Sequence, residues 1–142
     1  MNEKISKEEK LMALLSHMSI FIPNVGILAP IIIWVTNKEK SDFVRFHALQ
    51  AIFFQLIFFI LMMLFMFAGI ILMLAAIPWF DLSSNAEPGI VFFLSMVFMF
   101  MFFSLWIIFG IYAIVASVKS YMGKIFKYAL IGNIIKRKVY SG

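Results

Sequence analysis

The sequence predicts an all-α membrane protein: a small helical bundle with two long transmembrane helices, a broken or re-entrant N-terminal helix pair and a C-terminal amphipathic helix at the membrane interface. Of 142 residues, 64% are hydrophobic and 13% are charged, whereas a soluble protein is roughly half apolar and about a quarter charged. Two apolar runs are long enough to cross a bilayer, and the charges gather at the termini and in loops. We expect residues 1–142 to form a single membrane domain, because this length allows only one.

The first apolar region, residues 11–36, contains its own turn. Pro23 and Gly26 enclose a turn signal, and Pro30 follows it. We therefore expect two short helices over about residues 8–21 and 27–36. At 1.5 Å per residue they are about 21 and 15 Å long, and each is shorter than the roughly 30 Å hydrocarbon core. Either the pair spans once as a broken helix, or it enters the membrane and returns.

Two long apolar helices follow this region. The polar loop 37–42 ends in Ser41 and Asp42, which are good helix N-caps, and the next helix is expected over residues 43–77. Residues 80–89 are acidic, rich in turn formers and free of Lys and Arg. The last span is expected over residues 90–118. Each span exceeds the roughly 20 apolar residues that a crossing requires.

The last span carries a strip of small residues. Gly110, Ala113 and Ser117 fall at i, i+3 and i+7, which places them on one helix face. Small residues allow helices to approach closely in a membrane, so this face is a candidate for helix packing. Chance placement of small residues in a long apolar helix explains the pattern equally well.

The tail, residues 119–139, is basic and amphipathic, and we expect a helix that lies along the membrane surface. Its basic side is expected to contact anionic lipid headgroups, with about 1 kcal/mol for each residue close to the surface. The residues concerned are Lys124, Lys127, Lys136, Arg137 and Lys138.

The distribution of Lys and Arg predicts the orientation in the cell membrane. The tail holds six basic residues, the loop 37–47 three and the loop 80–89 none. By the positive-inside rule, the tail and the first loop are cytoplasmic and the loop 80–89 lies outside. The N-terminus carries three Lys before residue 11, so it also prefers the inside. Both termini are then cytoplasmic, which favours a re-entrant pair over residues 11–36.

The ionisable residues argue against an enzyme. All seven carboxylates lie in termini or loops, whereas an ion-coupled carrier needs an ionisable group within the membrane and a zinc protease needs a His-Glu-x-x-His helix. The absence of cysteine excludes disulfides and thiolate metal sites. Because the basic residues flank apolar runs, they indicate a membrane and not a nucleic acid. We expect a protein that is not an enzyme, with no cofactor and no metal.

The most informative polar residues begin the first long span. Projected at 100° per residue, His47, Gln50 and Gln55 share an arc of about 140°, and Arg45 points nearly opposite His47. Polar side chains are costly against lipid and should face the bundle, where they either join helices or line a ligand or conduction path. His17 can meet His47 only if the first segment is re-entrant. The candidate buried polar cluster is therefore His17, Arg45, His47, Gln50 and Gln55.

Part of the sequence resembles a known family, and the segments that carry the resemblance are residues 11–19, 30–34, 43–51 and 127–135. The third contains Arg-Phe-His-x-x-Gln at a helix start. The segments are similar to a widespread prokaryotic family of small membrane proteins of unknown function, the Tic-twenty-like family, which itself resembles an import component of the chloroplast inner envelope. The resemblance implies four segments with both ends on one side. The tail departs from the pattern, with Ala129 and Asn133 where the family has Pro and Arg.

These observations favour a non-enzymatic multi-pass membrane protein that serves as a structural or assembly component, by analogy with a translocon subunit. Its expected partners are the anionic lipid bilayer, itself and other membrane proteins. The alternative is a small transporter or channel subunit in which His47, Gln50 and Gln55 line a polar path. Protection against a peptide toxin or against stress is a third hypothesis.

Overall fold

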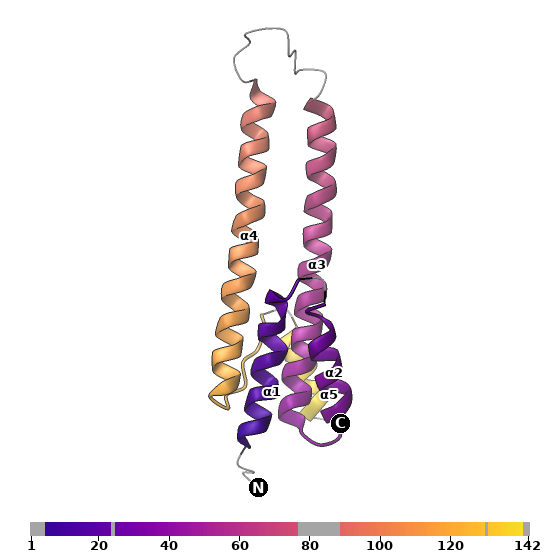
Figure 1. Ribbon diagram of the computed structural model, residues 1–142, viewed down its shortest axis with the longest axis vertical. Coiled ribbons are helices and arrows are strands. Elements are labelled where there is room, and N and C mark those ends of the chain that lie inside the picture. Colours follow the sequence, from indigo (N-terminus) through magenta and orange to yellow (C-terminus); the bar gives the residue numbers. More distant parts are fainter. Residues whose placement is uncertain (1–4, 24, 77–88, 130, 141–142) are drawn as a thin grey trace. The chain divides into compact units, whose positions relative to one another are not determined.

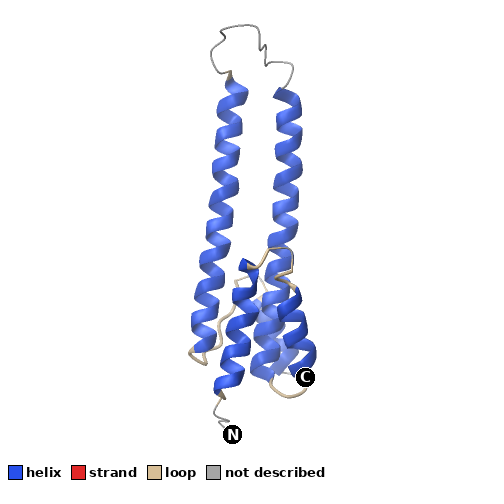
Figure 2. Cartoon of the chain, viewed as in Figure 1, coloured by secondary structure: helices blue, strands red, loops and turns tan. Residues whose placement is uncertain are grey.

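The computed structural model describes residues 5–23, 25–76, 89–129 and 131–140, and its secondary structure in these ranges is entirely helical (Figure 1, Figure 2). The prediction of an all-α protein with two long apolar helices is confirmed. The elements are α1 (Lys7–Met18), the 3-10 turn η1 (Ser19–Phe21), α2 (Leu28–Asn37), α3 (Asp42–Ala76), α4 (Ile90–Tyr121) and α5 (Gly132–Tyr140).

The chain forms two compact units. The first comprises Met1–Ile57 with Phe109–Gly142. It contains the three short helices, the N-terminal part of α3 and the C-terminal part of α4. The second comprises Phe58–Ile108, which contains the remaining parts of the two long helices.

A capping box starts α1, and a tight turn follows η1. The Glu9 backbone N–H donates to Ser6 Oγ at 3.1 Å, and the Ser6 N–H donates to Glu9 Oε2 at 2.7 Å. The turn closes at Gly26, whose N–H donates to the Ile22 carbonyl at 3.0 Å. A Cβ on Gly26 would overlap the carbonyl oxygen of Ser19. Glycine is therefore the residue that lets the chain reverse here.

In the first unit, α1 and α3 lie side by side and run in the same direction. Near their starts the Ser41 hydroxyl interacts with the Glu9 carboxylate, and one turn further along Ala13 packs against Val44. The loop between α2 and α3 therefore lies beside the first turn of α1. It follows that α2, which contacts α1, returns to the end at which α1 begins (Figure 1).

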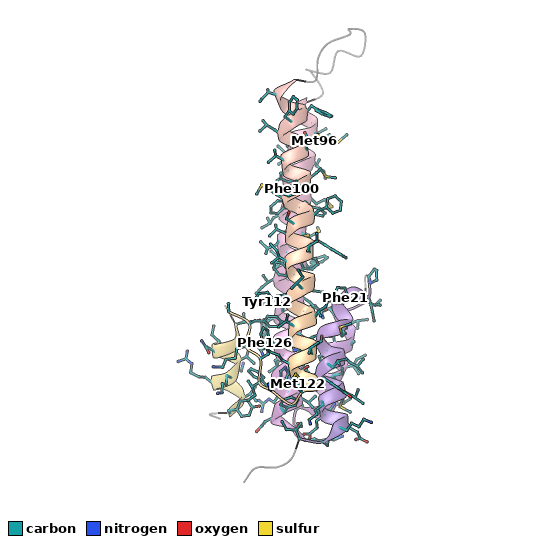
Figure 3. All side chains as sticks on the ribbon, turned by 90° about the vertical axis from the view of Figure 1, so that its left-hand side faces the viewer. Phe21, Met96, Phe100, Tyr112, Met122 and Phe126 are labelled. Carbon is teal, nitrogen blue, oxygen red and sulfur yellow. The ribbon has the colours of Figure 1, made fainter. Side chains whose placement is uncertain are left out.

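Both long helices have the length and composition needed to cross a membrane. Their apolar stretches are Asp42–Leu74 and Phe92–Tyr121, and no part of the most apolar window of either is buried. Figure 3 shows Met96 and Phe100 projecting outward from α4; they are 58% and 74% exposed. Soluble monomers rarely expose such continuous apolar surface, so these faces suit lipid. The predicted outer loop 80–89 lies outside the described residues apart from Gly89.

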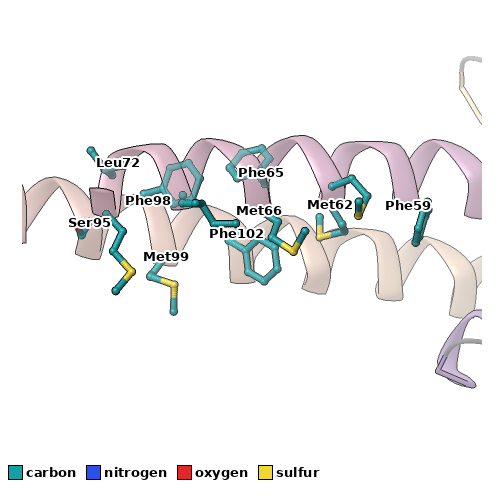
Figure 4. A pocket seen from close by; sticks show the side chains of 13 residues that line it. Phe59, Met62, Phe65, Met66, Leu72, Ser95, Phe98, Met99 and Phe102 are labelled. Carbon is teal, nitrogen blue, oxygen red and sulfur yellow. The ribbon is translucent and has the colours of Figure 1, made fainter. Parts of the chain in front are cut away.

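In the second unit, α3 and α4 pack through aromatic rings. Phe65 lies near Phe98 and Phe102, with ring centroids 5.2 and 6.4 Å away. Gly69 makes room for Phe98, because a Cβ at this position would stand only 2.9 Å from that ring. Beside these contacts an open apolar groove of about 510 Å³ is lined mainly by Met and Phe side chains (Figure 4).

The tail differs from the single helix that we expected over residues 119–139. α4 continues to Tyr121, and Gly123 then turns the chain with a φ of 74°. Residues 124–128 are not helical, and α5 starts at Gly132. The stretch that we expected to form one amphipathic helix is therefore divided into the end of α4, a non-helical segment and α5.

The tail is not one continuous helix because the backbone of residues 126–128 is hydrogen-bonded to another part of the chain. The side-chain amide of Gln50 bonds to the backbone of residues 126–128, which takes the place of helical bonds. The amphipathic pattern holds within α5, where Ile135 and Val139 pack against Phe46 of α3.

Candidate functional site

Two histidines form the centre of a buried polar cluster in the first unit. His17 on α1 and His47 on α3 are 2% and 0% exposed, and His17 Nε2 lies 3.1 Å from His47 Nδ1. They meet because the two helices run parallel from neighbouring starts. One of these nitrogens donates and the other accepts, so at least one of the two rings is neutral.

Tyr128 extends this chain of hydrogen bonds. Its hydroxyl lies 3.1 Å from His17 Nδ1, and its ring stacks on Phe54 with centroids 4.1 Å apart and 6° between the planes. Reasoning from the sequence gives Tyr128 no role, because it is 111 positions away from its partner. The only signal is a tyrosine among the apolar side chains of the tail.

Gln50 holds the non-helical part of the tail. Its Nε2 donates to the Phe126 carbonyl at 2.8 Å, and its Oε1 accepts from the Tyr128 N–H at 2.9 Å. Gly132 packs against the same amide, since a Cβ there would lie 3.0 Å from Gln50 Oε1. Backbone outside a helix needs such partners in apolar surroundings, and Gln50 supplies two of them.

Gln55 joins α3 to the end of α1. Its Nε2 donates to Ser19 Oγ at 2.9 Å and lies 3.4 Å from the Ser16 carbonyl. The Ser19 hydroxyl in turn donates to that carbonyl at 2.9 Å. Both serines are buried, and neither was among the predicted site residues. Their signal in the sequence is the i, i+3 spacing, which places the two serines on one face of the helix.

The structure does not bring Arg45 into the cluster. Its side chain is 34% exposed, and Nη1 lies 4.0 Å from Asp42 Oδ1 one turn earlier on α3. The helical projection explains this position. Arg45 lies two residues before His47, so its side chain points away from that of His47.

The small residues of α4 occupy two environments. Ala113 and Ser117 are buried, and the Ser117 hydroxyl donates to the Ala113 carbonyl at 2.8 Å. Gly110 is half-buried and faces Phe21 of η1, whose ring would stand 3.5 Å from a Cβ.

The basic residues that we expect at lipid headgroups lie on the surface of the first unit. Lys136 is half-buried, and the Lys127 ammonium donates to Asn133 Oδ1 at 3.2 Å. The exposed members are Lys124, Lys127, Arg137 and Lys138.

Burial sets the protonation of the cluster. Removal from water lowers the pKa of His17 well below its usual value, and the adjacent His47 lowers it further. Burial likewise raises the pKa of the Tyr128 hydroxyl, with Tyr112 adding to the effect. His17 and Tyr128 are therefore both uncharged around neutral pH.

The arrangement is suited to holding helices together. Within the ranges that the structure describes, no three His, Cys, Asp or Glu side chains gather closely enough to hold a metal ion. Most polar atoms of the cluster bond to other protein atoms. His47 Nε2 is buried without a well-formed hydrogen bond to any described residue, and the backbone of Lys124 is a polar group beside this ring.

Residues 8–135 match the model of one protein family, the magnetosome magnetite crystal formation protein family. The resemblance to the Tic-twenty-like family is therefore wrong. His47 and Gln50, which carried much of that resemblance, build the polar cluster, and residues that maintain a fold do not specify a function. No curated protein and no solved structure matches the chain.

Proposed function

The chain belongs to the magnetosome magnetite crystal formation protein family, and from this premise we propose that it is a non-enzymatic structural component of the magnetosome membrane that takes part in forming the magnetite crystal. The observation that carries the proposal is the family match over residues 8–135 in a chain with two helices long and apolar enough to cross a membrane. The family description names crystal formation and no reaction. The translocon analogy is given up together with the resemblance that suggested it.

We infer a multi-pass topology in which α3 and α4 cross the membrane and the α1–α2 pair enters and returns. The contact between Glu9 and Ser41 supports the return, because it joins the start of α1 to the loop that follows α2. With the basic segments in the cytoplasm, both termini are cytoplasmic. The acidic loop 80–89 then faces the compartment in which the crystal grows.

The hydrogen bonds of the cluster support a structural role over the alternative of a transporter or channel subunit. A polar path through the protein needs side chains that are free to exchange partners. The amide of Gln50 is occupied by the backbone of Phe126 and Tyr128, and the Gln55 amide by Ser19. These bonds fix α1 and the tail against α3.

We further propose that the surface of the first unit contacts anionic headgroups, and that the protein assembles with itself or with other membrane proteins. The basic tail supports the first part, since exposed Lys and Arg close to a membrane surface each contribute about 1 kcal/mol. The exposed apolar faces of α3 and α4 leave room for a neighbouring helix. Crosslinking in native membranes tests the assembly, and recovery of monomers alone would exclude it.

The topology is tested by cysteine labelling, because the native chain has no cysteine. Lys38→Cys and Ser84→Cys are prepared separately, and crystal-bearing vesicles isolated from the cells are treated with a membrane-impermeant thiol reagent. We expect Lys38→Cys to be labelled at once and Ser84→Cys only after permeabilisation. Labelling of Ser84→Cys in intact vesicles would contradict the proposed orientation.

The role in crystal formation is tested in magnetite-forming cells that lack this chain. We expect electron microscopy to show a changed distribution of crystal sizes, which the intact chain restores. Fractionation should recover the protein with the crystal-bearing membranes. Unchanged crystals after deletion would overturn the proposed function.

A further inference from the structure

The α1–α2 hairpin, residues 7–37, has arms that match half of a bilayer. The apolar part of the first arm, residues 11–21, is about 16 Å long, and the ten residues of α2 are about 15 Å long at 1.5 Å per residue. The hydrocarbon core measures roughly 30 Å, so each arm has the depth of one leaflet. The chain reverses at Gly26, where a Cβ would overlap the Ser19 carbonyl.

The outer faces of both arms are apolar, with charges at one end only. Each arm carries exposed residues at i, i+4 and i+7, between 39% and 61% exposed: Leu11, Leu15 and Met18 on α1, and Leu28, Ile32 and Val35 on α2. The charged side chains lie in the first turn of the hairpin and in the loop directly after it, which together form its open end: Lys7, Glu8, Glu9, Lys10, Lys38, Glu39 and Lys40. This pattern fits the acyl chains of one leaflet, with the four lysines at the level of anionic phosphates.

Helix α5 of the tail lies near the open end of the hairpin. Ile135 and Val139 of α5 pack against Phe46, in the second turn of α3, close to the loop that ends the hairpin. The outer side of α5 exposes Ile134 beside Arg137 and Lys138, which is the composition of a helix at a headgroup boundary.

We propose that the α1–α2 hairpin inserts into the cytoplasmic leaflet alone and makes the protein prefer membranes in which that leaflet is convex. A helix that crosses the bilayer occupies area in both leaflets, whereas a half-depth hairpin occupies area in one. Insertion of this kind is sensitive to curvature, because a convex leaflet has more space between its headgroups. The inference rests on the proposed topology, in which the cytoplasmic leaflet is the outer leaflet of a vesicle that encloses a crystal.

The test measures sorting between flat and curved membrane. The full chain with Lys38→Cys is reconstituted into giant vesicles of phosphatidylcholine and phosphatidylglycerol and labelled from outside with an impermeant dye, so that only molecules with the hairpin in the outer leaflet are seen. Thin tubes are then drawn outward from the vesicles. We expect a ratio of protein density in the tube to that in the vesicle above one, rising as the tube narrows.

Two comparisons identify the hairpin as the cause. Leu15→Ala with Ile32→Ala reduces the volume of the hairpin and should bring the ratio towards one. Leu64→Ala with Ile71→Ala changes two similarly exposed residues of α3 and should leave the ratio unchanged. Ser84→Cys labelled from outside reports the inverted molecules, which should be depleted from the tube. Equal densities in tube and vesicle, or equal sorting in both double variants, would overturn the proposal.

A separate measurement distinguishes failure of the curvature inference from failure of the proposed topology. Lys7→Cys and Lys38→Cys stand at the two ends of the hairpin and should react with impermeant reagents from the same side of the membrane. If Lys7→Cys reacts instead from the side on which Ser84→Cys reacts, residues 7–37 span once and the curvature inference fails with the topology. If both react from one side and no sorting is seen, the topology stands and the curvature inference alone is wrong.

Discussion

Gln50 shows how one side chain can stabilise a stretch of chain that lacks regular structure. Its amide offers a donor and an acceptor, and both are used by the backbone of residues 126–128. Two backbone groups that would otherwise be buried without partners are thereby paired. The non-helical stretch can therefore lie in apolar surroundings, where an irregular backbone is otherwise excluded.

We expect Gln50→Met to destabilise the protein. Methionine has nearly the volume of glutamine, but its side chain can form neither of the two hydrogen bonds. The Phe126 carbonyl and the Tyr128 N–H would be left unpaired, at about 1–3 kcal/mol for each buried group. The free energy of unfolding in detergent micelles measures the loss. Asn133→Met is the control, since Asn133 is exposed and its substitution should cost about 0.5 kcal/mol or less. Equal losses in both variants would show that the Gln50 bonds contribute nothing.

The lowered pKa of His17 makes the stability of the protein depend on pH. The unfolded chain takes up a proton as the pH falls through the ordinary histidine value of 6.5, while His17 in the folded protein stays neutral well below it. The contribution of His17 to the free energy of unfolding should therefore be fully present above about pH 6.5 and should decline as the pH falls below that value. Melting temperatures between pH 7.5 and 5 test this. In His17→Gln the decline should be shallower, and an unchanged slope would exclude His17 as its source.

At the scale of elements, local signals predicted the helices well and long-range bonds limited the rest. The expected helices over residues 8–21 and 27–36 agree closely with α1, η1 and α2, because Pro23 and Gly26 fix the break locally. The interruption after Tyr121 could not be predicted, since it depends on a glutamine 76 and 78 positions earlier in the chain. Gly123 alone hinted at it.

The reversal between α1 and α2 depends on one glycine. We expect Gly26→Ala to destabilise the hairpin, because the added Cβ would overlap the Ser19 carbonyl and lie 2.7 Å from that of Ile22. Overpacking of this kind costs about 1–3 kcal/mol. Faster proteolysis of the N-terminal segment and a lower melting temperature would report it. Gly89→Ala is the matched control, because a Cβ there meets nothing within 4 Å; a similar loss in both variants would contradict the expectation.

At the scale of the whole molecule, composition predicted the class and helical spacing predicted part of the site. The 100° projection groups His47 with Gln50 and Gln55, and all three are buried. The place of Tyr128, which bonds to His17, follows only from tertiary structure. The segments that resemble another family did not identify the chain's own family, because residues that maintain a fold do not specify a function.

The orientation should depend on the basic tail. We expect replacement of Lys136, Arg137 and Lys138 by Gln to increase the fraction of inverted molecules, because positive charge near the ends of spans sets orientation. A Ser84→Cys reporter in the same chain should then label more in intact, isolated crystal-bearing vesicles. Replacement of the two lysines by Arg keeps the charge and should leave labelling unchanged. Unchanged labelling after the Gln replacement would show that the tail does not set the orientation.

The bonds between His17, Gln50 and Tyr128 also have a consequence for the making of the protein. Synthesis proceeds from the N-terminus, so His17 and Gln50 enter the bilayer before Tyr128 and Phe126 leave the ribosome. A chain cut short after α4 would keep both spans and yet hold polar groups without partners, each costing about 2–7 kcal/mol in an apolar environment. The residues made after α4 are thus the ones that pair these buried polar groups, so a copy that stops before them lacks the bonds that join the tail to α1 and α3.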